Sequence, residues 1–132
     1  MSVDVVIVNW NSGRLLKDCV DSIQQFGVEV IDTVVVVDND SEDDSVEFLS
    51  ALSDVQLIQA NENLGFGKAC NLGARHCSSE YILFLNPDAQ LYEHSLATLL
   101  SFMESDANSS VGICGPQLDN EFQLTITTST DI

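Results

Sequence analysis

The sequence predicts an α/β fold in which helices cover both faces of a mostly parallel sheet. Short β-branched runs, such as residues 3–8, alternate along the chain with segments whose apolar residues recur at helical spacing. These runs are almost uninterrupted by polar residues, which is typical of strands buried on both faces. Alternating strands and helices of this kind form parallel sheets with right-handed crossovers.

Each predicted strand is a short buried run that ends at a polar or glycine-containing turn. The Thr-rich tail over 121–130 could pair as an edge strand or as a hairpin. Internal repeats, low-complexity linkers and charge blocks are absent from the sequence, so we expect a single domain over 1–132. In chain order, the strands are predicted at 3–8, 33–37, 55–58, 81–85 and 111–114.

The predicted helices lie between these strands. The first runs from Leu15 to Phe26, and Gly27 provides a stop signal. Ser41 is expected to be the N-cap of the second, where Asp44 also favours the positive end of the helix dipole. In chain order, the helices are predicted at 15–26, 46–52, 70–74 and 96–103.

Composition excludes several classes of protein. The 132 residues are 45% hydrophobic, and 21 Asp and Glu face only 4 Lys and Arg, for a formal net charge of -17. This argues against disorder, and against nucleic acid or an anionic membrane surface as a direct partner. The sequence has no apolar run of the roughly 18–20 residues that span a bilayer and no basic signal-peptide start, so a cytoplasmic location is expected. The four scattered cysteines predict buried, reduced thiols.

Polar residues follow three of the predicted strands. They are Asn9-Trp10-Asn11 after the first, Asp38-Asn39-Asp40 after the second and Asn86-Pro87-Asp88 after the fourth. The carboxyl ends of parallel strands share one edge of the sheet, and ligands of such sheets bind there. We therefore expect these three turns to contribute to one site.

The residue types in these turns suggest a nucleotide site. Asp38 can accept a hydrogen bond from a base or a ribose hydroxyl, and Trp10, the only tryptophan, offers a face on which a base can stack. Asp88 is a hard oxygen ligand suited to Mg²⁺ or Mn²⁺. Each also has a purely local explanation: an Asx turn at Asp38 that caps the next helix, a strand-ending turn at Asp88 and a half-buried core aromatic at Trp10.

Three familiar phosphate-handling patterns do not fit. Gly65-Phe66-Gly67 lacks the third glycine of a dinucleotide-binding loop, because position 70 is Cys70. A P-loop ending at Lys68 would need glycine where Glu62 stands. A phosphorylated receiver domain would need paired acids after the first strand, where the chain has Asn9 and Asn11.

Four segments nevertheless resemble the family 2 glycosyltransferases, and especially their rhamnosyltransferase-like branch. The segments are 5–11, 35–41, 62–67 with the following Asn71, and 81–88. They occur in the same order as the family's motifs, and the resemblance extends over nearly the whole chain.

The resemblance implies the GT-A fold of nucleotide-diphospho-sugar transferases, a Rossmann-like three-layer sandwich. It also implies that Asp88 meets the ribose and a divalent metal, although Asn86 stands where an acid is commoner and is a weaker ligand. Trp10 would pack on the base and Asp38 would bond the base or ribose. The implied nucleotide-sugar site comprises Asn9, Trp10, Asn11, Asp38, Asp40, Asn63, Gly65, Asn71 and Asp88.

The resemblance further implies inverting sugar transfer to a saccharide or lipid-linked acceptor, assisted by Mn²⁺ or Mg²⁺. The family's catalytic base lies in a later acidic motif, so we expect it beyond Ile132 and expect these residues alone to bind donor with little turnover. A lipid-linked acceptor would place the protein at the inner face of the cell membrane, through a partner or a further region. The alternative is a non-catalytic nucleotide-binding module. With a net charge of -17, either should need a cation to hold a diphosphate.

Overall fold

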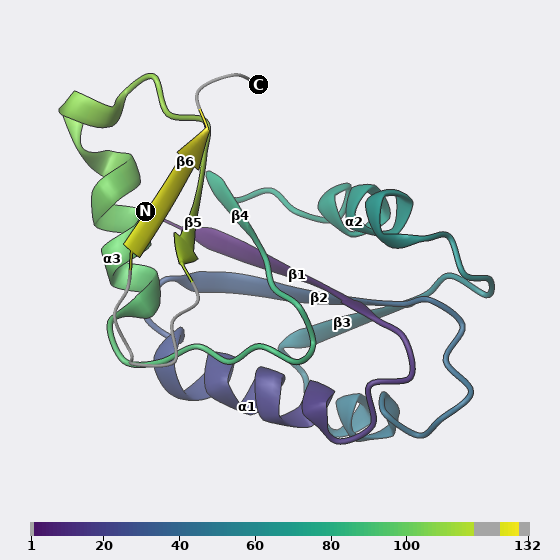
Figure 1. Cartoon of the computed structure of the whole chain (residues 1–132). Coiled ribbons are helices and arrows are strands. Elements are labelled where there is room, and N and C mark those ends of the chain that lie inside the picture. The colour runs from purple at the N-terminus through teal and green to yellow at the C-terminus, as the bar shows by residue number, and fades with distance from the viewer. Residues whose placement is uncertain (1, 118–124, 130–132) are drawn as a thin grey trace. The chain divides into compact units, whose positions relative to one another are not determined.

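The structure is a computed structural model that describes residues 2–117 and 125–129. The chain forms two compact units, Met1–Leu91 and Tyr92–Ile132. The single domain expected from the sequence stays a prediction. The first unit contains β1 (Val3–Asn9), α1 (Leu15–Phe26), β2 (Ile31–Asp38), the 3-10 helix η1 (Glu47–Ala51), β3 (Val55–Gln59), α2 (Phe66–Ala74) and β4 (Tyr81–Phe84) (Figure 1).

The first unit is built on a four-stranded sheet in the order β3-β2-β1-β4, in which every pair of neighbours is parallel. The two central strands end together, because Asn9 at the end of β1 is the register partner of Asp38 at the end of β2. Asp38 in turn is paired with Gln59 at the end of β3. The strand-end turns expected to form a site therefore leave the same edge of the sheet.

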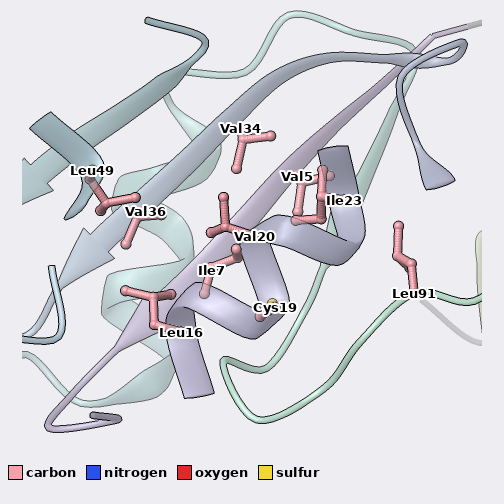
Figure 2. Close-up of a cluster of buried hydrophobic side chains, with 10 residues drawn as sticks. All are labelled: Val5, Ile7, Leu16, Cys19, Val20, Ile23, Val34, Val36, Leu49 and Leu91. Carbon is pink, nitrogen blue, oxygen red and sulfur yellow. The ribbon is translucent and has the colours of Figure 1, made fainter. Parts of the chain in front are cut away.

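Helices cover both faces of this sheet, as the buried strand pattern predicts. Alternate residues of β1 and β2 pack against α1 in a cluster that includes Val5, Ile7, Val34 and Val36 (Figure 2). The intervening residues of β2 face α2 on the other side, where Val35 and Val37 pack with Ala69. The predicted α/β fold with a mostly parallel sheet is confirmed.

A glycine lets α2 approach the sheet closely. Gly73 is buried, and a Cβ atom at this position would stand 2.5 Å from Cγ1 of Val6 and 3.1 Å from Cγ2 of Val37. Both neighbours are β-branched and have little freedom to move aside. The helix can therefore lie this close to β1 and β2 only because residue 73 has no side chain.

One predicted helix is wrong. The segment predicted to be helical at 46–52 forms only the short η1, and Ser41 is not its N-cap, since η1 begins after Val46. The Ser41 backbone N–H and hydroxyl both bond the Asp38 carboxylate instead. Ser and Asp side chains that bond nearby backbone compete with helix formation, and this loop contains several of them.

The second unit contains α3 (Ser95–Glu104), the 3-10 helix η2 (Asp106–Asn108), β5 (Ile113–Gln117) and β6 (Thr125–Ser129). β5 and β6 pair antiparallel in a two-stranded sheet of their own. The Thr-rich tail therefore supplies a strand, as expected, and it pairs with β5. Part of that tail, at 121–124 and 130, lies outside the described residues, and β5 begins two residues later than the strand predicted at 111–114.

Two further sequence expectations concern individual features. The cysteines Cys19, Cys70, Cys77 and Cys114 are all free thiols, as predicted, but only Cys19 is buried and the other three are partly exposed. Within the described part of the chain, we find no helix that is both long and apolar enough to cross a membrane.

Candidate functional site

The candidate site is organised around a contact between the ends of the two central strands. The amide nitrogen of Asn9 donates to Oδ1 of Asp38 at 3.0 Å and to the hydroxyl of Ser45 at 2.9 Å. All three residues are buried, and Asp38 is only 6% exposed. Within the described residues, Oδ1 of Asn9 is a buried acceptor that has no hydrogen-bond partner. The buried carboxylate thus receives a neutral donor from the neighbouring strand.

Ser41 supplies the remaining donors to this carboxylate. Its hydroxyl donates to Oδ1 of Asp38 at 2.6 Å, and its backbone N–H donates to Oδ2 at 3.1 Å. This is an Asx turn, the local alternative that the sequence left open at Asp38. An ionised carboxylate has about four acceptor positions, so these three bonds leave capacity at Oδ2 for one more donor.

The loop after β1 is tied to the loop after β2 by Asn11 and Asp43. The backbone N–H of Asn11 donates to the Ser41 hydroxyl, and the side-chain oxygen of Asn11 accepts from the backbone N–H of Glu42 at 2.8 Å. The Asp43 carboxylate accepts from the backbone N–H of Gly13 at 2.9 Å. Asn11 has φ 48, a left-handed conformation that asparagine tolerates better than most residues.

The charge state of Asp43 is stabilised by this loop. The hydrogen bond from the Ser45 hydroxyl is the main cause that holds the pKa of Asp43 below its ordinary value. The backbone N–H groups of Gly13 and Ser45 lower the pKa further and outweigh the opposing effect of desolvation. The carboxylate therefore remains an acceptor for the loop well into the acid range.

Asn39 connects β2 to the loop that precedes α2. Its side chain donates to the backbone oxygen of Gly65 at 3.2 Å and accepts from the backbone N–H of Leu64 at 3.2 Å. Within that loop, the side chain of Asn63 accepts from the N–H of Gly65 at 2.9 Å. Gly65 has φ 78, which favours glycine, and α2 begins at the next residue. The side-chain amides of Asn11 and Asn39 thus join the turns after β1 and β2 to each other and to the loop before α2. The third predicted turn, at 86–88, is bonded to α1 instead.

The other predicted site residues are presented to solvent. Trp10 follows Asn9 directly, is 56% exposed and belongs to neither of the hydrophobic clusters described above, so it is not a core aromatic. Asp40 lies in the β2 turn with φ 67. The remaining exposed members are Asn63, Asn71 on α2, and Asp88.

Asp88 lies in the turn after β4, next to α1. The thiol of Cys19, on the buried face of α1, donates to the backbone oxygen of Asn86 at 3.6 Å. Burial, and secondarily the nearby Asp88 carboxylate, raise the pKa of Cys19 to about 12. The thiol is therefore protonated at neutral pH and able to donate.

Asp88 can supply only part of the ligands that a metal ion needs. The described residues contain no group of three or more His, Cys, Asp or Glu side chains that could hold an ion by themselves. Mg²⁺ and Mn²⁺ are commonly held by one or two carboxylates together with substrate phosphates, and the exposed Asp88 carboxylate can serve in that way. The residues therefore fit a metal that is shared with a bound diphosphate.

Six residues whose side chains hold these turns were not predicted as members of the site. They are Cys19, Ser22, Asn39, Ser41, Asp43 and Ser45. Asn39 and Ser41 lie beside predicted site residues, and that position was the only available signal. The roles of the other four depend on contacts between segments far apart in the sequence, which leave no local pattern.

The chain matches the family model described as glycosyl transferase family 2 over residues 4–128. It belongs to this family. The chain is 27% identical over 123 residues to the O-antigen chain rhamnosyltransferase RfbN of Salmonella typhimurium, covering 92% of this chain and 38% of the relative. It is 28% identical over 115 residues to the glycosyltransferase GlyG of Streptococcus pneumoniae, covering 83% of this chain and 38% of the relative. This family 2 chain thus spans well under half the length of these relatives.

Two solved structures illustrate the similarity in fold. The mannosyltransferase PcManGT from Pyrobaculum calidifontis, solved in complex with GDP-Man and Mn²⁺, aligns with a TM-score of 0.70 at 23% identity, covering 79% of this chain and 32% of that one. The S. aureus TarS 1-349 structure aligns with a TM-score of 0.68 at 22% identity, covering 79% and 32%. These likenesses support the GT-A type of α/β fold for this family 2 member.

Proposed function

We propose that this chain is the donor-binding part of a glycosyltransferase that takes a sugar from a nucleotide-diphosphate sugar. The observation that carries the proposal is the Asn9–Asp38 hydrogen bond at the carboxyl ends of β1 and β2, followed by an exposed Trp10. A rigidly held acceptor next to an exposed aromatic is suited to a nucleoside. Membership in glycosyl transferase family 2 supports the same class of ligand.

In this proposal the nucleoside binds at the ends of β1 and β2. Oδ2 of Asp38, which can accept one more hydrogen bond, accepts it from a base N–H or a ribose hydroxyl. Trp10 stacks on the base. Asn9 and Asn11 act by holding Asp38 and its loop in place. Asp40, Asn63, Gly65 and Asn71 complete the pocket around the nucleotide.

We assign the diphosphate to the turn after β4. Asp88 would hold a Mn²⁺ or Mg²⁺ ion, which when bound neutralises charge that develops on the departing diphosphate. The complex of PcManGT with GDP-Man and Mn²⁺ supports this pairing of ligand and metal. Because Asp88 is an exposed acid on a chain of net charge -17, a diphosphate would otherwise meet a repelling surface.

The transfer itself is proposed to invert the anomeric carbon, with a saccharide or a lipid-linked molecule as acceptor. A base must then remove the proton of the acceptor hydroxyl as it attacks. We assign donor binding, and not this base catalysis, to the residues of the site. RfbN is an O-antigen chain rhamnosyltransferase, which supports a role in polysaccharide assembly. A lipid-linked acceptor would be met at the inner face of the cell membrane.

The fluorescence of Trp10 provides a direct test, because it is the only tryptophan. Titration with UDP, GDP, ADP or dTDP in the presence of Mn²⁺ should quench the emission with at least one of them. Asp38→Ala should weaken this binding by about tenfold or more, through the loss of a hydrogen bond to the ligand. Glu29→Gln is the control, since it removes one exposed charge outside the site. Binding by none of the four nucleotides, in a protein whose circular dichroism shows it to be folded, would refute the proposal.

The same pocket could serve a nucleotide-binding module without turnover. The two functions differ in the release of nucleoside diphosphate from the nucleotide-sugar when saccharide acceptors are added. Release above the buffer rate would support the transferase, whereas tight binding without release would support the module.

A further inference from the structure

The turn that carries Asp88 is attached to α1 at both of its ends. At the first end, Asn86 O accepts the Cys19 thiol at 3.6 Å as well as the backbone N–H of Ala89 at 3.0 Å, which closes the turn. At the second end, the backbone N–H of Leu91 donates to the hydroxyl of Ser22 at 2.9 Å. Asp88 lies between these two attachments.

The two attachments come from one face of the helix. Cys19 and Ser22 are three positions apart and are linked by a bond from the Ser22 hydroxyl to the backbone oxygen of Cys19 at 2.7 Å. Both are buried, as is Leu91. Cys19 and Leu91 belong to the apolar cluster between α1 and the sheet (Figure 2). Neither anchoring group can rotate into solvent, so the ends of the turn are held by the core of the unit.

We infer that Cys19 and Ser22 are positioning residues that hold the Asp88 turn at the place where a metal-bound diphosphate would meet it. The inference rests on the proposed function, because it assumes that Asp88 holds the metal. An exposed carboxylate on a free turn would lose conformational freedom whenever a ligand bound. A turn that is anchored at both ends has already lost most of that freedom.

A purely structural role would give a different pattern of effects. If the two bonds only stabilise the fold, substitutions should lower stability and weaken all ligands equally. If they position Asp88, substitutions should weaken only the part of binding that depends on metal and phosphates. The quantity to measure is therefore the Mn²⁺ enhancement, defined as the dissociation constant of the nucleoside diphosphate in EDTA divided by that in Mn²⁺. The nucleoside without phosphates reports on the rest of the site.

The test uses Cys19→Ala and Ser22→Ala in the full chain, with ligand binding followed by Trp10 fluorescence. Each should reduce the Mn²⁺ enhancement by about tenfold, the lower end of what residues that orient a metal ligand contribute. Affinity for the nucleoside should stay within about twofold, because the Asn9–Asp38 contact is untouched. Cys19→Ser keeps a donor at the same place and should recover most of the enhancement.

Two variants serve as matched controls. Cys77→Ala removes a thiol that donates to a backbone oxygen at the same 3.6 Å, but the acceptor is Gly73 in the last turn of α2 and not the Asp88 turn. Val20→Ala removes a fully buried side chain from the same helix without removing either anchoring bond. Both should lower thermal stability and leave the enhancement unchanged.

The outcomes separate the two proposals. An unchanged enhancement in folded Cys19→Ala and Ser22→Ala proteins would overturn the inference and leave the proposed function intact. Equal losses of affinity for the nucleoside and the nucleoside diphosphate would also overturn it, because they would indicate a purely structural role. If the unsubstituted chain binds nucleotide but shows no Mn²⁺ enhancement, the assignment of the metal to Asp88 is wrong, and this inference is wrong with it. If Ser22→Ala does not fold, Cys19→Ala compared with Cys19→Ser decides the question alone.

Discussion

Asn9 and Asp38 are register partners at the last paired positions of β1 and β2, and their side chains are joined by a hydrogen bond of 3.0 Å from Nδ2 to Oδ1. The same amide nitrogen also reaches the Ser45 hydroxyl. A single neutral side chain thus fixes both the carboxylate and the loop beyond it. An amide suits this role in a chain with few Lys and Arg residues, because it donates hydrogen bonds to a buried carboxylate while remaining neutral.

Asn9→Ala should therefore lower the free energy of unfolding by about 1–3 kcal/mol, because it leaves buried acceptors without their donor. Asn9→Asp should cost more at neutral pH, since it places a second carboxylate against Asp38. Two such groups cannot readily both ionise, and the pKa of the pair should be raised. The excess cost of Asn9→Asp over Asn9→Ala should then shrink as pH falls from 7 to 5, measured by urea denaturation.

Ser12→Ala is a suitable control for these variants, because Ser12 lies in the same loop and only its backbone oxygen is used, by the N–H of Leu15. A pH-independent difference between Asn9→Asp and Asn9→Ala would contradict the electrostatic explanation.

The edge of the sheet where Asn9 and Asp38 meet could be predicted from sequence, because buried β-branched runs end there in polar residues. The Asx turn at Asp38 was one of the explanations left open, and it is formed, but it does not cap a helix as expected. Whether Asp38 also binds a nucleotide stays a prediction. The local pattern marks which residues end the strands, but the partners of their side chains depend on loops more than 25 residues away.

The parts that could not be predicted are decided by competition between neighbouring or distant groups. The segment at 46–52 has apolar residues at helical spacing, yet the preceding loop uses Ser45 and Asp43 to bond each other and Gly13, and only η1 forms. The pairing of β6 with β5 is likewise a contact that the sequence of the tail left open, because the tail fits either an edge strand or a hairpin.

Gly73→Ala should destabilise the first unit. The added Cβ would stand 2.5 Å from Cγ1 of Val6, so α2 would have to move away from the sheet. Overpacking of this kind costs about 1–3 kcal/mol, which exceeds the helix propensity gained by alanine. Thermal unfolding followed by circular dichroism would measure the loss.

Two comparisons identify the cause. Gly67→Ala lies on the same helix with nothing within 4 Å of its added Cβ, so it should be neutral or slightly stabilising. Val6→Ala made together with Gly73→Ala should cost less than the sum of the two single changes, because it makes room for the new methyl group. Strict additivity would mean that the clash with Val6 is not the cause.

Asp4 should make the fold sensitive to acid. Its side chain is 1% exposed and accepts the backbone N–H groups of Ser78 at 2.7 Å and Ser79 at 2.9 Å, together with the Ser79 hydroxyl at 2.9 Å. Burial alone would raise the pKa of Asp4, but these hydrogen bonds, with one from the backbone of Thr33, outweigh it and hold the pKa below its ordinary value of 3.8. A depressed pKa in the folded state means that the carboxylate adds stability above 3.8 and that this contribution is lost as pH falls below it.

Asp4→Asn should accordingly lower the free energy of unfolding by about 1–3 kcal/mol at pH 7, since a single amide oxygen replaces two acceptors. The difference from the unsubstituted chain should narrow below pH 4 in guanidinium titrations. Asp32→Asn provides the comparison: Asp32 accepts from the same Ser79 hydroxyl at 3.2 Å but is exposed, so its loss should change stability little. If the free energy of unfolding differed between Asp4→Asn and the unsubstituted chain by the same amount from pH 7 to 3, this explanation would be contradicted.

Removal of divalent metal should separate the two halves of the proposed donor site. The nucleoside part, at Asp38 and Trp10, needs no cation, whereas the diphosphate must approach the exposed Asp88 on a chain of net charge -17. EDTA should therefore weaken the binding of a nucleoside diphosphate by about tenfold or more, equivalent to about 1.4 kcal/mol. The affinity for the corresponding nucleoside should not change. Added salt should partly restore diphosphate binding in EDTA, because it screens the repulsion, but weaken it in Mn²⁺, because it screens the attraction.

Asp88→Asn should lower the affinity for the diphosphate in Mn²⁺ and slightly raise it in EDTA, both measured by Trp10 fluorescence. A general loss of folding would lower both affinities, so it cannot explain this result. Equal sensitivity of nucleoside and diphosphate to EDTA would instead mean that the metal supports the fold of the site as a whole.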